Sequence, residues 1–348
     1  MIKLPGLIDI HVHLRDPEQT YKEDFFTGTS AAVSGGFAYI FDMPNNKKPI
    51  FTLKALKEKI NLVKKKAVCD IGFYFGSIGD NLDEFKKVKN LVFGLKLYLD
   101  QTTGNFLVDK KKLKNIFQTW NDSKPILLHA EGESVNQVLK IVEETGQRVH
   151  FCHVGLTDDL KKIISAKKKQ LPVTVGVTPH YLFLTKNDVK NLGSFGLMKP
   201  PLGTRKDQNY LWKNLKYIDF VESDHAPHTI EEKKSATPPF GVPGLETTLS
   251  LLLTAVSEKK LTMKRLIELC YENPKKIFNI ITDKNTYVEI DEREEYIIDN
   301  KKLFTKCGWS PFNGWKVKGR VKRVFIRGKK VYDNGRLLVK PGYGRFIS

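Results

Sequence analysis

The chain has few cysteines, no C-x-x-C spacing and no long apolar run. Only 4 of its 348 residues are cysteine, and they are scattered singly at Cys69, Cys152, Cys270 and Cys307. This usage argues against a disulfide framework and is typical of the reducing cytosol, so we expect a cytoplasmic protein. No apolar stretch reaches membrane-spanning length and the N-terminus lacks a signal-peptide pattern, so we expect no membrane partner.

Acidic residues are scarce relative to basic ones, at 39 against 58, which gives a formal net charge of +19. Such a charge requires that nucleic-acid binding be considered. The basic clusters are short, however, and each falls on an expected surface helix, at residues 64–66, 110–112 and 167–169. None is interleaved with aromatic residues. A solvated lysine-rich surface is therefore favoured over nucleic-acid binding, and an acidic substrate or partner domain also fits the charge.

Strand patterns alternate with helix patterns over most of the chain. The expected strands are the run with the first two histidines (6–15) and the runs 37–43, 68–75, 92–99, 126–130, 149–154, 173–177 and 218–222. Eight such alternations favour an α/β fold of the (β/α)₈ TIM-barrel type over an open sheet. From about residue 286 apolar and polar residues alternate, and 333–335 is a hairpin-turn signal. We expect a barrel over 1–285 and a small β appendage over 286–348 packed beside it.

Six candidate metal ligands stand at the ends of these expected strands. His11 and His13 are two residues apart in a strand, so both imidazoles point to the same face. Single residues end later strands, and they are Lys96, His129, His153 and Asp224. The active site of a parallel barrel collects one side chain from the end of each of several strands. Neutral imidazoles and carboxylates together suit zinc, so we predict a metal site.

Lys96 is the unexpected member of this set. His11, His13 and Asp224 can hold one ion, and His129 and His153 can hold a second. Two dications a few Å apart repel, so an anion must bridge them. An ammonium group cannot do this, whereas a lysine that has reacted with CO₂ carries an anionic carbamate with two oxygens. We therefore predict a carboxylated Lys96.

Three polar residues near the ligands could contact a substrate. Arg15 follows His13 by two residues and is a fork donor suited to a carboxylate. Asn45 ends the second strand, and His228 follows Asp224 by one turn. Together they describe a site for a small anionic amide. A surface salt bridge for Arg15 and a turn-forming role for Asn45 remain open alternatives.

These motifs resemble those of the dihydroorotases of the amidohydrolase superfamily, most closely the dihydroorotase domain of animal multifunctional pyrimidine-synthesis polypeptides. The likeness runs over nearly the whole chain, and the segments that carry it are 4–9, 22–25, 43–45, 94–99, 129–131, 152–154, 223–228, 243–247 and 341–344. The resemblance implies two zinc ions bridged by carboxylated Lys96, with Asp224 as both ligand and general acid/base. It further implies that Arg15, Asn45 and His228 bind the substrate carboxylate.

The implied reaction is the reversible cyclisation of N-carbamoyl-L-aspartate to L-dihydroorotate in pyrimidine biosynthesis. The resemblance also implies a homodimer, or association with a larger pyrimidine-synthesis assembly. The N-terminus begins almost at the first strand, and this with the high positive charge favours a domain from a longer chain or one that associates with a partner.

The chain departs from the animal-type pattern at three places. Cys152, which together with a glutamate is associated with an additional metal, is present, but the glutamate position is Gly176, so a third ion is doubtful. An arginine after the seventh strand is replaced by Lys199, which cannot make a bidentate contact. In the flexible loop after the fourth strand Thr102 matches, but the following aromatic residue is replaced by Thr103, which could loosen loop closure.

Two alternative functions stay open. Hydantoinases, dihydropyrimidinases and allantoinases share the two-metal barrel, but their rings do not need an arginine at the position of Arg15. A catalytically inactive dihydroorotase-like scaffold should have lost metal ligands, whereas all six are present here.

Overall fold

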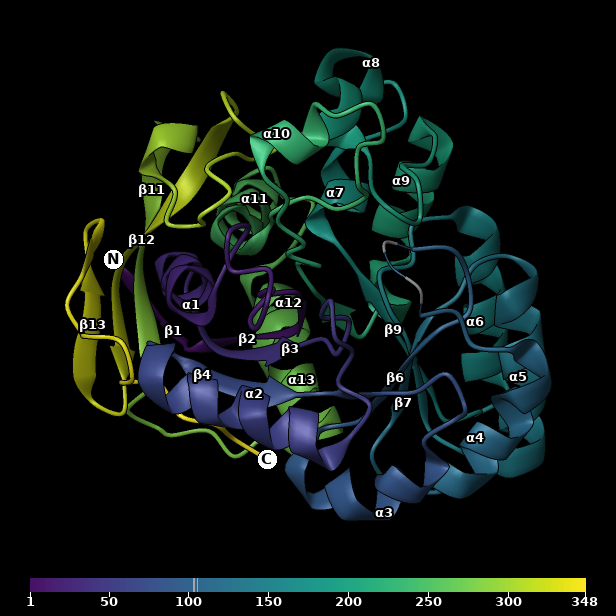
Figure 1. Ribbon diagram of the computed structural model, residues 1–348. Coiled ribbons are helices and arrows are strands. Elements are labelled where there is room, and N and C mark those ends of the chain that lie inside the picture. The colour runs from purple at the N-terminus through teal and green to yellow at the C-terminus, as the bar shows by residue number, and fades with distance from the viewer. Residues whose placement is uncertain (103, 105) are drawn as a thin grey trace.

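A parallel β-barrel forms the centre of the computed structural model, which describes residues 1–102, 104 and 106–348 (Figure 1). Its strands form two sheets with the orders β2-β3-β4 and β5-β6-β7-β8-β9-β10. β4 and β5 are halves of one strand interrupted at Tyr74, so the described residues give an eight-stranded barrel. The strands are Leu7–Val12 (β2), Phe37–Asp42 (β3), Asp70–Phe73 (β4), Phe75–Gly76 (β5), Leu95–Tyr98 (β6), Ile126–His129 (β7), Val149–Phe151 (β8), Val173–Val177 (β9) and Phe220–Val221 (β10).

The barrel closes between its first and last strands. Val12 and His225 form a parallel bridge, and the backbone N–H of His13 donates to the carbonyl of His225 at 2.8 Å. The buried Asp9 carboxylate accepts the N–H groups of His11 at 3.1 Å and Ser223 at 3.2 Å. These contacts bring the ends of β2 and β10 together and confirm the predicted barrel.

Helices surround the strands, as the alternating pattern predicts. The longer ones are Phe25–Ser34 (α1), Leu53–Lys66 (α2), Leu113–Trp120 (α4), Glu133–Thr145 (α5), Thr157–Lys168 (α6), Arg205–Lys213 (α9) and Leu245–Ser257 (α11). The shorter ones are Phe85–Val88 (α3), Pro179–Phe183 (α7), Val189–Leu192 (α8), Ile230–Lys233 (α10), Met263–Ile267 (α12) and Asn273–Ile277 (α13). Thr52 caps α2 through its side chain, and left-handed Gly146 ends α5.

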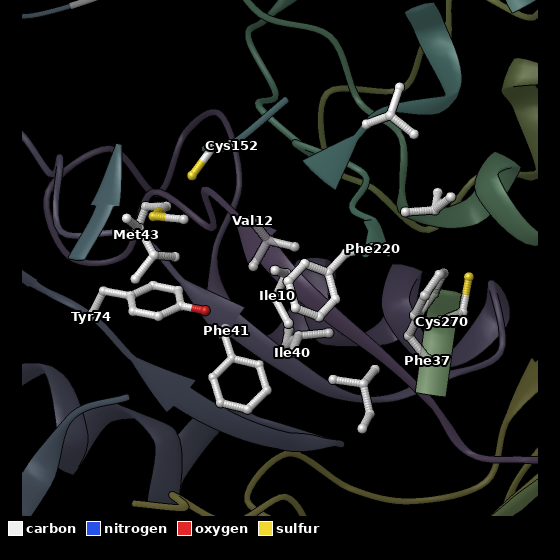
Figure 2. Close-up of a cluster of buried hydrophobic side chains, with 14 of the residues drawn as sticks. Ile10, Val12, Phe37, Ile40, Phe41, Met43, Tyr74, Cys152, Phe220 and Cys270 are labelled. Atoms are coloured by element: carbon white, nitrogen blue, oxygen red, sulfur yellow. The ribbon is translucent and has the colours of Figure 1, made fainter. Parts of the chain in front are cut away.

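An aromatic cluster fills part of the core beneath the site. The ring of Phe278, directly after α13, lies 6.3 Å from Phe41, 6.1 Å from Tyr74, 6.4 Å from His150 and 5.7 Å from Phe220, measured between centroids. Figure 2 shows other apolar side chains of β2, β3 and β10 converging near this region, with Cys152 at the edge of the cluster. Close packing of this kind holds the strand ends above it in fixed positions.

A second, antiparallel sheet forms the appendage at the left of Figure 1, with the order β1-β11-β12-β13-β14. Its strands are Ile2–Pro5 (β1), Tyr287–Ile297 (β11), Lys316–Ile326 (β12), Lys329–Asp333 (β13) and Arg336–Leu337 (β14). The division at residue 285 stays a prediction, but residues 2–5, which the sequence pattern places with the barrel, pair instead with 287–290. The sequence pattern could not predict this pairing, because β1 and β11 are separated by most of the chain.

The C-terminal segment ties the appendage to the barrel. One guanidinium nitrogen of Arg327 donates to both carboxylate oxygens of Asp70 in β4. The other donates to the Tyr343 carbonyl at 2.9 Å. Phe346 forms a bridge with Ile71 and stacks on Phe73. None of the described helices combines the length and the apolar character needed to cross a membrane.

Candidate metal centre and active site

The six predicted ligands all lie at one end of the barrel. His11 and His129 belong to the C-terminal halves of β2 and β7, and Lys96 is the second residue of β6. The other three follow β2, β8 and β10 within three residues, namely His13, His153 and Asp224. All six are buried; Lys96 is fully inaccessible and Asp224, the most exposed, is 8% accessible. Parallel strands end on the same side of a barrel, which explains why residues far apart in sequence meet here.

Short distances join five of the six side chains into one cluster. The Oδ1 atom of Asp224 lies 3.4 Å from Nε2 of His11 and 3.1 Å from Nε2 of His13. Nδ1 of His129 lies 3.3 Å from Nε2 of His153, and the His11 and His153 rings are 5.0 Å apart between centroids. His11, His13 and Asp224 offer ligand atoms within 4.8 Å of one another and could hold one ion.

The donor atoms of this cluster fit a metal. Nε2 of His11, Nε2 of His129 and Nδ1 of His153 are buried and have no hydrogen-bond partner among the described residues. A buried polar nitrogen without a partner is costly unless an ion binds it. Burial, reinforced by neighbouring cations, holds the pKa values of His11 and His153 well below the ordinary range, so both imidazoles are neutral.

Asp224 is ionised in the same environment. Burial would raise its pKa, but the hydrogen bond from His13 and the charges of neighbouring histidines outweigh burial and lower it. Neutral imidazoles and an ionised carboxylate are the protonation states that metal binding requires. The residues present therefore suit a divalent cation of the zinc type.

Lys96 is buried near His11 and His153 and has no acidic partner among the described residues. Its Nζ donates to Sγ of Cys152 at 3.2 Å and stands 5.0 Å from the centroid of the Tyr98 ring. No carboxylate lies within salt-bridge distance of this amine in the described part of the chain. A buried amine without a counter-charge is costly to maintain, and the carboxylation predicted from the sequence would convert it into an anion.

The backbone of the site is strained at three of its functional residues. Arg15, His153 and Asp224 have positive φ angles of 65°, 39° and 46°. The left-handed region is uncommon for residues with a Cβ, and such conformations concentrate at functional sites. These turns direct the side chains that follow β2, β8 and β10 back over the barrel mouth.

Glu222, which the sequence analysis did not single out, supplies a second carboxylate beneath the metal ligands. It is fully buried, and its Oε2 atom lies 3.3 Å from Nδ1 of His11 and 3.4 Å from Nε2 of His150. Its other oxygen accepts the backbone N–H of His153. A carboxylate on Nδ1 directs Nε2 of His11 toward the ion, an arrangement common around bound metals.

The same carboxylate fills the space next to Gly176. A Cβ atom added at Gly176 would lie 2.2 Å from Oε1 of Glu222, so the carboxylate that follows β10 occupies the space beside position 176. His11, Cys152 and Glu222 offer ligand atoms within 4.8 Å of one another. The number of ions stays a prediction, and it depends on Glu222 as well as on position 176.

His150 gives this buried cluster a pH dependence. Burial alone would lower its pKa, but the Glu222 carboxylate and the Cys152 thiol raise it to about 9, from 6.5 in an unperturbed histidine. Because the folded pKa is the higher one, the stabilisation is fully present below pH 6.5 and is lost as the pH rises through 9. We expect about 3 kcal/mol of unfolding free energy to be lost over this window. Urea unfolding of the metal-free chain and of His150→Gln should show it, and parallel pH profiles for the two proteins would contradict it.

The three predicted substrate residues have different surroundings. Arg15 is buried, and its Nε donates to the Pro227 carbonyl at 3.1 Å. No carboxylate lies within salt-bridge distance of Arg15 among the described residues, so the surface salt-bridge alternative is wrong.

Asn45 accepts a hydrogen bond from Nδ1 of His13 at 2.6 Å, which leaves its amide NH₂ for a ligand. Arg15 and Asn45 both line the cavity at the barrel mouth. His228 is fully buried behind Arg15 and is not part of the cavity lining, so its contact with substrate stays a prediction.

Other residues singled out in the sequence also reach the cavity. Thr102 and Lys199 line it, together with Tyr98, whose buried hydroxyl has no hydrogen-bond partner among the described residues. Thr103 lies outside the described residues. The sequence offered a signal for the residues it missed, because Glu222 precedes Asp224 by two positions and His150 precedes Cys152 by two. In a strand this spacing places each pair on one face.

Comparison with known proteins agrees with this site. The sequence matches the amidohydrolase family over residues 2–331. It is 45% identical over 349 residues to the multifunctional protein CAD of Squalus acanthias, covering 100% of this chain and 16% of that protein. It is 36% identical over 368 residues to the dihydroorotase of Pyrococcus furiosus, covering 99% of this chain and 84% of that enzyme. The chain thus spans 16% of the length of its multifunctional relative and most of the length of the archaeal one.

Solved structures share the fold. An L-hydantoinase from Arthrobacter aurescens superposes with a TM-score of 0.94 at 25% identity, covering 99% of this chain and 88% of that one. An inactive dihydroorotase-like domain of a Chaetomium thermophilum CAD-like multifunctional protein superposes with a TM-score of 0.85 at 27% identity, covering 100% and 99%. The resemblance found in the sequence is confirmed: the chain belongs to the amidohydrolase family and, by its likeness to dihydroorotases over its full length, to the dihydroorotase branch of that family.

Proposed function

We propose that this chain is a dihydroorotase that interconverts N-carbamoyl-L-aspartate and L-dihydroorotate. The observation that carries the proposal is the Arg15 guanidinium, which is buried beside the candidate metal ligands without a carboxylate partner. An unpaired buried cation is expensive to maintain unless a ligand supplies the counter-charge. The carboxylate of dihydroorotate supplies this counter-charge, whereas the rings of dihydrouracil and hydantoin carry no carboxylate.

Two zinc ions are the cofactor that the donor set supports. His11, His13 and Asp224 would hold one ion and His129 and His153 the other, with a CO₂-derived carboxylate on Lys96 between them. Bound there, zinc supplies Lewis-acid polarisation of the scissile carbonyl and a water of lowered pKa. We expect two ions rather than three, because both oxygens of Glu222 are already occupied by His11, His150 and the His153 backbone N–H.

The chain's own residues then handle protons and orientation. Asp224 is ionised and lies at the barrel mouth, so in ring closure its Oδ atom accepts the proton of the attacking ureido nitrogen. In ring opening the same atom returns that proton to the leaving nitrogen. Arg15 and the Asn45 amide hold the second carboxylate, which fixes the distance between the reacting atoms.

The decisive experiment combines zinc quantification with turnover assays on one preparation. We expect about two zinc ions per chain and ring opening of L-dihydroorotate, with little activity on dihydrouracil, hydantoin or allantoin. A preference for a neutral ring would favour the hydantoinase-type alternative, which the likeness to the A. aurescens enzyme keeps under test. Metal-free protein without turnover would instead indicate an inactive scaffold like the C. thermophilum domain; the six converging ligands argue against that outcome.

Arg15→Ala should weaken substrate binding while leaving the metals in place. The loss of a charge-assisted hydrogen bond of about 3 kcal/mol corresponds to a rise in KM of about a hundredfold. Arg15→Lys is the matched control, because it keeps the charge but loses the fork geometry, and should give an intermediate KM. Steady-state kinetics with zinc analysis measure both effects, and an unchanged KM in the alanine variant would remove Arg15 from the substrate site.

For partners and location we propose a cytoplasmic homodimer, or a domain within a larger pyrimidine-synthesis assembly. Support for an assembly comes from the multifunctional relative, which contains a region 45% identical to this chain. The archaeal dihydroorotase, most of whose length this chain covers, supports the stand-alone alternative. Light scattering of the purified chain distinguishes a dimer from a monomer.

A further inference from the structure

A largely buried cluster behind Arg15, which includes the predicted substrate residue His228, takes no part in the proton transfers described above. It consists of Lys22, from the segment before α1, and of His228 and Glu232 at either side of the start of α10. The Lys22 ammonium is 5% accessible and lies 2.8 Å from Oε1 of Glu232 and 3.2 Å from Nδ1 of His228. Tyr21 donates its hydroxyl to the same Glu232 oxygen at 3.0 Å. Lys22 and Glu232 thus form an ion pair next to Nδ1 of the buried His228 imidazole.

The chemistry of these contacts determines where His228 carries its proton. A lysine ammonium has three donors and no acceptor, so Nδ1 of His228 must present its lone pair to Lys22. The proton then resides on Nε2, which lies 3.0 Å from the carbonyl of Phe240 and can donate to it. Burial, together with the nearby charges of Arg15 and Lys22, lowers the pKa of His228 to about 3, in agreement with a neutral ring.

This tautomer has a consequence for Arg15. Its Nη2 atom lies 3.2 Å from Nε2 of His228, but both atoms carry protons and neither can accept from the other. The guanidinium therefore gains no acceptor from His228, and its Nη2 protons stay available to an incoming anion. The opposite tautomer would turn Nε2 into an acceptor and bind Arg15 to the protein instead.

We propose that Lys22 is a positioning residue that keeps His228 neutral with its proton on Nε2, so that Arg15 remains available for an anionic ligand. The ligand class, a small carboxylate, rests on the proposed function. The arrangement of protons does not, because it follows from the contact of Lys22 with Nδ1 and of the Phe240 carbonyl, which can only accept, with Nε2. If Lys22 is removed, Oε2 of Glu232, 3.6 Å from Nδ1, becomes the nearest charged group to that nitrogen. Nδ1 then carries the proton and donates it to Glu232, and Nε2 becomes an acceptor that binds Arg15, 3.2 Å away.

NMR of the zinc-loaded chain with ¹⁵N-labelled histidine tests the proton arrangement directly. The His228 signals are assigned among the 8 histidines by their loss in His228→Gln. We expect an unprotonated Nδ1 and a protonated Nε2 in the unsubstituted protein, and the reverse arrangement in Lys22→Met. The double variant Lys22→Met/Glu232→Gln, which lacks the carboxylate acceptor, should return the proton to Nε2. A proton on Nδ1 in the unsubstituted protein, or a His228 signal that Lys22→Met leaves unchanged, would overturn the proposal.

Kinetics provide the functional readout. Lys22→Met should raise the KM for L-dihydroorotate about tenfold, with kcat within about twofold and unchanged zinc content. Lys306→Met is the control, because Lys306 pairs with Asp24 in the same region but does not contact His228. Equal KM values for Lys22→Met and the control would contradict the positioning role. If the chain instead acts only on neutral rings, the proposed function fails while the NMR result still stands, so the two failures are distinguishable.

Discussion

Lys96→Ala is expected to remove most of the bound zinc and to lower turnover about 10³-fold or more, a loss of at least about 4 kcal/mol of transition-state stabilisation. The physical reason is that the proposed bridge between the two ions is the carboxylate on Lys96, which the variant cannot form. Lys96 is fully buried, and its only hydrogen-bond partner among the described residues is Cys152. Without the bridging carboxylate two dications would face each other unscreened. Zinc analysis and the dihydroorotate assay measure both losses.

Two further experiments separate loss of the bridge from loss of the fold. Added bicarbonate should not rescue Lys96→Ala, because the variant has no amine to carboxylate. Lys96→Glu supplies a shorter anion at the same position and should recover part of the zinc. Thermal unfolding monitored by circular dichroism shows whether the variants are folded. Full activity in folded Lys96→Ala would refute the bridge.

Asp224→Asn should abolish measurable turnover in both directions. The carboxylate is ionised in the folded chain and lies within 3.4 Å of both His11 and His13, so it is placed to bind a metal and to carry a proton. An amide cannot accept the proton of the ureido nitrogen, and the loss of a general base together with a ligand costs about 10³-fold or more.

The reversibility of the reaction sharpens this test. The equilibrium constant does not depend on the enzyme, so kcat/KM must fall by the same factor for ring closure and ring opening. Both directions should be assayed at several pH values, with zinc measured on each sample. A variant that keeps zinc but loses turnover separates the proton-transfer role of Asp224 from its role as a ligand. Residual activity above about a tenth of the original would mean that another group carries the proton.

The amino-acid sequence by itself determined the barrel and the choice of the six candidate ligands. Each ligand ends a short apolar run, and parallel strands present their C-terminal ends on the same side. The local strand patterns were therefore enough to predict the barrel and the convergence of these residues. The structure places His11, His129 and Asp224 together as predicted.

Only the tertiary structure decided contacts between strands and segments that the chain order keeps apart. Glu222 occupies the space beside Gly176, β1 pairs with β11 across almost the whole chain, and Lys22 meets His228. Periodicity reports which face of a strand a residue occupies, but not which side chain fills the volume next to it. Packing between distant segments is set by shape and by the need to pair buried polar groups, and these become defined only when the chain has folded.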